Sequence, residues 1–237
     1  MISIVGVTKR HGPRTVLADV TFQALPGRVT AFLGPNGAGK SSTLRILLGL
    51  DRPSAGTALI DGCQYRNLSE PLRTVGSMLE GSGSHRSRTA RNHLAWIAQA
   101  SGIPKRRVDQ VLAQVGLADA GRMRVGRFSL GMGQRLGLAA ALLGEPAALV
   151  LDEPVNGLDP EGIRWVRGLL RAHADAGGTV LLSSHLMSEV GEIADDLAII
   201  AGGHVVAAGP IGRVTAGYAS LEDAYFALTA PPQGDRR

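Results

Sequence analysis

The chain has 237 residues, of which 44% are hydrophobic and 19% charged, and 25 Lys and Arg against 20 Asp and Glu give a net charge of +5. This composition suits one globular domain with a sizeable core and excludes collagen-like, low-complexity and disordered chains. No stretch approaches the roughly 18 consecutive apolar residues of a membrane span, and the N-terminus lacks the layout of a signal peptide. We therefore expect a cytoplasmic protein, and its single cysteine excludes an internal disulfide.

The N-terminal part is predicted to contain strands and one helix. Apolar runs within residues 2–7, 16–22 and 29–33, separated by turn residues, predict three strands. The leucines after Lys40 recur at helical spacing until Gly49, which predicts a helix there. A further short strand is expected at residues 57–61.

The middle of the chain is helical and strongly basic. Apolar residues recur at helical spacing from about residue 85 to 142, with Pro104 in the first turn of one helix. Residues 81–142 contain ten cations and two anions, a net charge of +8. We expect residues 1–237 to form one domain in which about 81–142 are an inserted helical subdomain.

The C-terminal part alternates strands with helices, which predicts a parallel α/β sheet. A helix is expected to begin at Asp159-Pro160 and to end at Gly177-Gly178. The other elements expected here are strands at 147–151 and 179–182, a helix near 187–194, a hairpin of 197–200 with 204–208, and a last helix at 221–228.

The strongest motif lies between a predicted strand and a predicted helix, where residues 34–41 fit G-x-x-x-x-G-K-[ST]. In such a loop the backbone N–H groups and the helix N-terminus face phosphate oxygens. We expect Lys40 to reach the β- and γ-phosphates of a nucleotide and Ser41 to bind Mg²⁺. The predicted nucleotide-binding residues of this loop are Gly34, Pro35, Asn36, Gly37, Ala38, Gly39, Lys40, Ser41 and Ser42.

Two adjacent carboxylates, Asp152 and Glu153, end the apolar strand predicted at 147–151. Doubly wound sheets bind ligands at the C-terminal ends of their strands, and successive side chains point differently. Asp152 can therefore hold the metal while Glu153 polarises the water that attacks the γ-phosphate. The alternative interpretation is an acidic pair that caps the N-terminus of a helix, but such a pair would need no buried apolar strand before it.

Three further stretches complete a pattern with these motifs: residues 128–135, 157–159 and 183–185. In order and spacing, the whole set resembles the nucleotide-binding subunit of an ABC transporter over essentially the full chain. The resemblance implies a P-loop NTPase (RecA-like) α/β core, with an N-terminal antiparallel β-subdomain and an inserted helical subdomain.

The resemblance also implies roles for individual residues. Ser129 and Gly131 fall in the signature motif, which binds the γ-phosphate of ATP held by a second subunit, so that catalysis requires a head-to-tail homodimer or heterodimer. Asp159 falls at the D-loop aspartate, which communicates across that dimer. His185 falls at the switch histidine that contacts the γ-phosphate.

Four residues depart from the commonest family pattern. Leu130 and Met132 replace a glycine and a glutamine of the signature, a variant similar to that of drug-, antibiotic- and bacteriocin-resistance exporters. Glu80 stands where a metal-contacting glutamine is usual, and it adds a negative charge near the γ-phosphate. His11 aligns with the aromatic residue that stacks on adenine.

These expectations lead to one functional hypothesis and two rivals. The hypothesis is an ATP-hydrolysing subunit of an exporter that uses ATP and Mg²⁺ and is held at the inner face of the cell membrane by a separate transmembrane permease. One rival is a soluble ABC-type ATPase acting on ribosomes or DNA, which usually has two cassettes or a long coiled-coil insertion. The other is an unrelated phosphate-loop kinase, which would leave the signature stretch unexplained.

The basic segment allows three interpretations: a surface near the permease and anionic lipid, a nucleic-acid surface, or a solvated face. Only Trp96 and Phe128 are aromatic within residues 81–142. The aromatic interleaving of a stacking surface is missing, so we expect no nucleic-acid partner.

Overall fold

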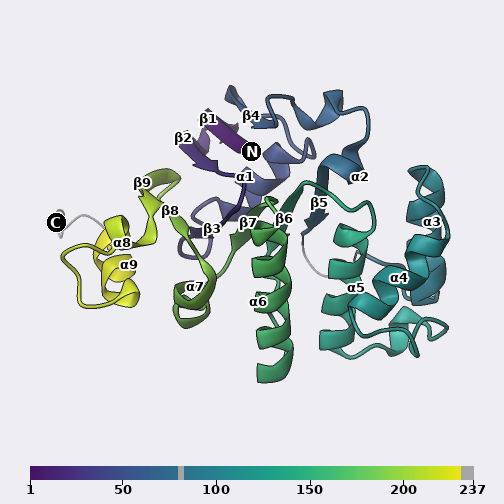
Figure 1. The fold of residues 1–237 in the computed structure, drawn as a ribbon. Coiled ribbons are helices and arrows are strands. Elements are labelled where there is room, and N and C mark those ends of the chain that lie inside the picture. Colours follow the sequence, from purple (N-terminus) through teal and green to yellow (C-terminus); the bar gives the residue numbers. More distant parts are fainter. Residues whose placement is uncertain (80–82, 231–237) are drawn as a thin grey trace.

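Two β-sheets organise the structure, a computed structural model that describes residues 1–79 and 83–230. The smaller sheet is antiparallel, in the order β2-β1-β4, and lies at the top of Figure 1. Its strands are β1 (Ile2–His11), β2 (Arg14–Ala24) and β4 (Ala55–Ile60). They confirm the strands expected at the N-terminus and at 57–61.

The larger sheet has six strands in the order β5-β6-β7-β3-β8-β9. All neighbouring pairs are parallel except β8 and β9, which form the expected antiparallel hairpin. The strands are β3 (Arg28–Leu33), β5 (Val75–Met78), β6 (Ala148–Asp152), β7 (Thr179–Ser183), β8 (Asp196–Ala201) and β9 (His204–Pro210). The predicted α/β core with an antiparallel N-terminal sheet is thus confirmed.

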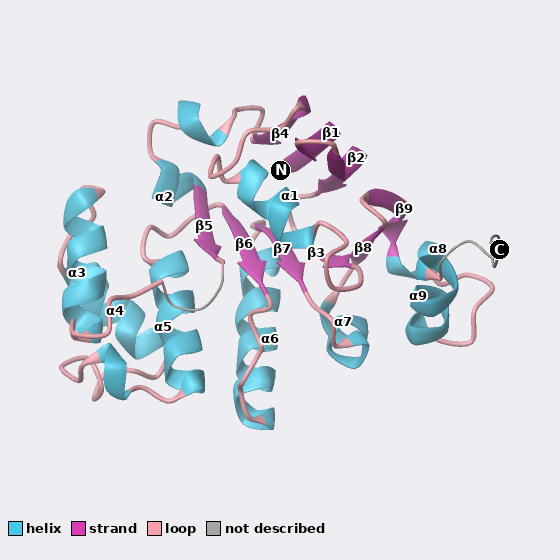
Figure 2. Cartoon of the chain, turned by 180° about the vertical axis from the view of Figure 1, so that it is seen from behind, coloured by secondary structure: helices cyan, strands magenta, loops and turns pink. Residues whose placement is uncertain are grey.

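Helices flank the larger sheet, as Figures 1 and 2 show from opposite sides. α1 lies toward the small sheet, while α5, α6 and α7 lie on the other side. The bounds of these and the C-terminal helices are α1 (Lys40–Leu47), α2 (Pro71–Thr74), α5 (Leu130–Leu142), α6 (Pro160–Asp175), α7 (Met187–Ile193), α8 (Ile211–Val214) and α9 (Leu221–Thr229).

The described part of the basic segment consists of helices joined by turns. Between Gly83 and β6 the structure places α3 (Ala90–Ala100), α4 (Arg106–Gln114), a 3₁₀ turn at Val125–Arg127, and α5. α3 and α4 form the outer end of the molecule beside α5 (Figure 1).

The apolar residues form two cores, one on each face of the larger sheet. Successive side chains of a strand alternate between the faces, so Phe32 of β3 joins the core beneath the small sheet and α1, while Ala31 and Leu33 join the core beneath α5 and α6. Val150 of β6 likewise faces α1, whereas its neighbour Leu151 faces the helices. The continuous apolar runs in the sequence reflect this burial on both faces.

None of the helices formed by residues 1–79 and 83–230 combines the length and the hydrophobicity that a membrane span requires.

Candidate functional site

The loop between β3 and α1 has the geometry of an anion-binding turn. Gly37 and Gly39 adopt left-handed φ values of 78° and 113°, which only glycine takes without strain. Gly39 precedes α1 without any side-chain cap, and no acidic residue lies in the first turn of the helix. The first N–H groups of α1 therefore remain available to phosphate oxygens.

Close packing against β8 fixes the start of this loop. A Cβ atom added to Gly34 would lie 2.4 Å from the carbonyl oxygen of Ile200, so no larger residue fits without moving the backbone. Ala38 is buried and donates its N–H to the carbonyl of Pro35 at 3.1 Å. Gly34 and Ala38 thus shape the loop.

Lys40 is buried, with 8% of its surface exposed. Its ammonium group donates hydrogen bonds to the carbonyl oxygens of Gly34 and Pro35. Burial lowers the pKa of Lys40, although the charges of Glu153 and Asp152 act in the opposite direction. A phosphate group bound at this loop would neutralise the positive charge of the buried Lys40 ammonium group.

A cavity of about 450 Å³ opens beside this loop and collects most of the predicted residues. Two lining residues, Arg14 and Val16, had no predicted role, and Arg14 pairs with His11 across the β1–β2 turn. The described residues that line it are His11, Arg14, Val16, Pro35, Asn36, Gly37, Gly39, Lys40, Ser41, Ser42, Asp152 and Glu153.

Ser41 and Asp152 offer oxygen atoms suited to Mg²⁺ in this cavity. The hydroxyl of Ser41 donates to Asp152 Oδ2 at 2.9 Å, and Ser183 Oγ donates to Asp152 Oδ1. No group of three or more His, Cys, Asp or Glu in the described chain could hold a metal ion. A hydroxyl and a carboxylate oxygen side by side suit Mg²⁺ that is bound mainly by phosphate and water, with one or two protein ligands. Glu80, the other expected metal contact, lies outside the described residues.

Glu153 follows β6 in a left-handed conformation, with a φ of 50°. Its N–H donates to Ser183 Oγ at 3.0 Å, and its carbonyl oxygen accepts a bond from Gln134 Nε2 at 2.8 Å. Its carboxylate Oε2 lies 2.8 Å from Nδ1 of His185. The structure thus brings both predicted catalytic residues into contact. Ser183 and Gln134 also lie within the motifs, but their spacing predicts no role for either residue.

The signature and D-loop residues lie together, but they are not among the residues lining the cavity of their own chain. Ser129 caps α5 by accepting the N–H of Met132 at 3.2 Å, and Asp159 caps α6 by accepting the N–H of Gly162 at 2.8 Å. A Cβ atom added to Gly131 would lie 3.4 Å from the side chain of Leu158. The signature therefore touches the D-loop.

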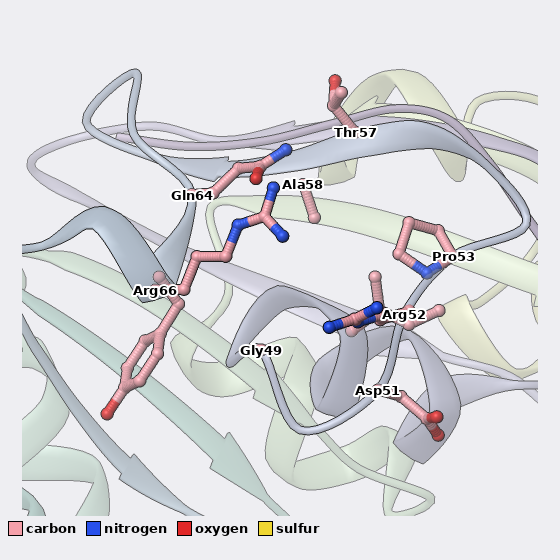
Figure 3. Close-up of a pocket in the computed structure, with 10 residues that line it drawn as sticks. Gly49, Asp51, Arg52, Pro53, Thr57, Ala58, Gln64 and Arg66 are labelled. Carbon is pink, nitrogen blue, oxygen red and sulfur yellow. The ribbon is translucent and has the colours of Figure 1, made fainter.

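A second cavity, of about 440 Å³, lies between the C-terminal end of α1, β4 and the 3₁₀ turn Tyr65–Asn67 (Figure 3). Arg52 and Arg66 line it, as does Asp51, which pairs with Lys9 at 3.0 Å. It shares no described lining residue with the phosphate-loop cavity. The predicted chemistry therefore belongs to the other cavity.

Comparison with known families gives one match over more than half of the chain. Residues 17–156 match the family model described as ABC transporter. This chain belongs to the ABC transporter family. It comprises the ATP-binding, ATP-hydrolysing domain of that family.

Two relatives are named for the transport of bacitracin and of a lantibiotic. The bacitracin transport ATP-binding protein BcrA of Bacillus licheniformis is 42% identical over 84% of this chain and 66% of its own length. The lantibiotic transport ATP-binding protein SrtF of Streptococcus pyogenes is 36% identical over 87% of this chain and 89% of its own. The chain thus spans just under two thirds of the first relative and most of the second.

Among solved structures, an ATP-binding subunit of an ABC transporter has a TM-score of 0.88 and 29% identity, covering 97% of this chain and 99% of its own. The match extends over the small sheet, the larger sheet and the helical segment alike. It confirms the ABC ATPase fold.

Proposed function

We propose that this ABC protein hydrolyses Mg·ATP to power a separate transmembrane permease that exports antibiotic- or bacteriocin-like peptides. One observation carries the proposal: a buried lysine, a hydroxyl–carboxylate pair and a glutamate in contact with a histidine meet at one phosphate-loop cavity. The names of the bacitracin and lantibiotic relatives support the substrate class. They favour an exporter over a ribosome- or DNA-directed ATPase.

The residues divide the chemistry among them. Lys40 and the N–H groups of α1 bind the phosphates, and Ser41 and Asp152 hold Mg²⁺. Glu153 accepts the proton of the attacking water, and His185, bonded to Glu153, contacts the γ-phosphate. Mg²⁺, when bound, would be held by Ser41 and Asp152 and would supply positive charge that neutralises the phosphate oxygens. His11 lines the cavity, and adenine would stack on it.

We further propose that the signature acts across a dimer, since Ser129 and Gly131 are not among the residues lining the cavity of their own chain. Asp159 would lie at the same dimer interface, beside the signature. Residues from about 81 to 142 would form a helical subdomain within a single domain of 1–237. Through the permease, the subunit would sit at the inner face of the membrane.

Two substitutions test the catalytic assignment. In Glu153→Gln the steady-state ATPase rate should fall by about 100-fold or more, while a fluorescent ATP analogue still binds. Lys40→Ala should weaken binding of that analogue, because the phosphates lose their buried cation. Retained turnover in the first variant, or unchanged affinity in the second, would contradict the assigned roles.

The transport role needs a separate experiment. The chain should be expressed with its neighbouring permease gene in a bacitracin-sensitive bacterium, and growth measured against bacitracin and a lantibiotic. Resistance should rise with the natural chain and not with Glu153→Gln at equal expression. An ATPase that confers resistance to neither peptide would refute the substrate class and leave the ATPase assignment standing.

A further inference from the structure

The backbone at Glu153 adopts a conformation that a non-glycine residue keeps only when its surroundings hold it. Its φ of 50° lies in the left-handed region, where the Cβ atom crowds the following carbonyl. The direction of the Glu153 side chain depends on this conformation. The contacts that hold the two peptide groups of Glu153 therefore also aim its carboxylate.

Hydrogen bonds hold both peptide groups. On the N-terminal side, the N–H of Glu153 donates to Ser183 Oγ of β7 at 3.0 Å. On the C-terminal side, the Glu153 carbonyl oxygen accepts the N–H of Asn156 at 3.2 Å, within the local turn. The same oxygen accepts Gln134 Nε2 at 2.8 Å, and only this last bond comes from a distant helix.

Gln134 is well placed to act on Glu153 specifically. It is 6% exposed and lies on α5, the helix that Ser129 caps. Its Nε2–H···O bond to the Glu153 carbonyl joins the helix of the signature to the loop that follows β6. A buried amide that loses its partner is costly, so the bond is firmly maintained.

We propose that Gln134 is a positioning residue for Glu153. It fixes the peptide group after Glu153, keeps the left-handed conformation, and so directs the carboxylate toward His185 and the attacking water. Because Ser129 caps the helix that contains Gln134, a second subunit that engages the signature also acts on the general base of the same chain. The inference rests on the proposed role of Glu153 as base.

Gln134→Met tests the proposal, because methionine keeps the length and volume of the side chain and removes the N–H donor. We expect kcat for ATP to fall about 10- to 100-fold, as for a misplacement of about 1 Å. The KM for ATP and the affinity for a fluorescent ATP analogue should stay within about twofold, since the phosphate loop is untouched. Gln99→Met is the matched control, because Gln99 is exposed on α3, and its kcat should equal that of the natural chain.

A double-mutant cycle separates positioning of Glu153 from a structural role. In the Glu153→Gln background, Gln134→Met should leave the residual rate unchanged, because the carboxylate that it positions is gone. A further fall by the same factor would show that Gln134 acts elsewhere. An unchanged kcat in the single variant, or equal losses in kcat and nucleotide affinity, would also overturn the proposal.

Two measurements keep the outcome interpretable. Thermal unfolding shows whether Gln134→Met folds. If it does not fold, Gln134→Asn, which shortens the amide side chain by one carbon, should show the same selective loss of kcat. An unchanged kcat in Gln134→Asn would overturn the proposal. A natural chain that binds ATP but does not hydrolyse it would refute the proposed function itself. A hydrolysing natural chain with a fully active Gln134→Met would refute only the role of Gln134.

Discussion

At the residue scale, the contact between the signature and the D-loop depends on Leu130 and Gly157. Leu130 is 71% exposed, yet a Cβ atom added to Gly157 would lie 2.1 Å from its Cδ2. Gly157 also has a φ of 73°. The unusual leucine of the signature therefore lies directly over a glycine whose backbone conformation disfavours a larger residue, and the Leu130 side chain would have to move to admit one.

Gly157→Ala should lower the free energy of unfolding by about 1 to 2 kcal/mol, because alanine disfavours the left-handed backbone conformation. The new methyl group also meets the Leu130 side chain, which adds to this loss. Urea unfolding measures the loss. In the Leu130→Ala background, Gly157→Ala should cost less, because the clash is relieved while the backbone cost remains. Equal costs in both backgrounds would show that the two residues do not interact.

The sequence predicts the site residues whose roles follow from local spacing. Lys40, Ser41, Asp152 and Glu153 fall in or beside motifs that set their positions relative to a strand or a helix. Gln134 differs because it reaches Glu153 across 19 residues of sequence. Such a bond depends on how α5 packs against the sheet, which no local pattern encodes.

At the scale of elements, α3 carries a buried histidine without a hydrogen-bond partner. His93 is 5% exposed, and among the described residues neither ring nitrogen has a partner. Burial lowers the pKa of His93, and the charge of Arg88 lowers it further. The folded protein therefore holds the imidazole neutral at a cost.

His93→Leu should raise the free energy of unfolding by about 1 to 3 kcal/mol, the cost of a buried unsatisfied polar group. Below pH 6.5 the unfolded chain binds a proton at His93 that the folded chain excludes, so the natural protein loses stability as the pH falls. Chemical unfolding at pH 7 and pH 5 should show a larger gain at pH 5. His204→Gln, an exposed control on β9, should change little; an equal gain at both pH values would contradict the buried neutral imidazole.

A carboxylate just before β8 joins three elements of the core. Asp195 accepts the N–H of Val29 in β3 at 2.8 Å and pairs with Arg171 of α6 at 2.8 Å. Burial alone would raise the pKa of Asp195, but the Val29 N–H and the Arg171 guanidinium together outweigh it and lower the pKa. The ionised form therefore favours the folded state.

Asp195→Asn should lower the free energy of unfolding at pH 7 by about 1 to 3 kcal/mol, because the bond to a charged group is lost. The pKa of Asp195 in the folded protein lies below the ordinary value of 3.8. Its contribution to the free energy of unfolding is therefore full above pH 3.8 and disappears as the pH falls through the folded pKa. Unfolding measured from pH 7 to pH 2 should show the two proteins converging in acid. Asp175→Asn, an exposed partner of the same arginine, should cost less than about 0.5 kcal/mol.

The sequence predicts which segments are helices and which are strands, but it predicts less well where they end and what the basic residues contact. The helix expected to contain Pro104 in its first turn begins at Arg106, and the N–H of Arg107 donates to the Pro104 carbonyl in the turn that leads into it. Some of the ten cations have local partners: Arg91 pairs with Asp109, and the guanidinium of Arg135 lies 4.6 Å from the ring centre of Trp165. These partners are distant in sequence, so composition alone could not assign them.

At the scale of the whole molecule, the separation of Ser129 from the residues lining the cavity gives a test of the proposed dimer. Lys40→Ala removes the phosphate lysine from one cavity, and Ser129→Arg blocks one signature. Each variant alone should be inactive. Mixing them should restore turnover, because a head-to-tail pair then contains one composite site with both natural residues. ATPase assays on mixtures, with co-purification of differently tagged chains, would show it; mixed dimers without turnover would place the signature in the same chain.

The division of the hydrophobic interior by the larger sheet has a consequence for cooperativity. β3 contributes Phe32 to one core and Ala31 and Leu33 to the other, so this strand packs against both cores. α1 belongs to one core only, and α6 to the other. Amide hydrogens of α1 and of α6 can thus exchange through separate local openings, whereas those of β3 exchange only when both cores open.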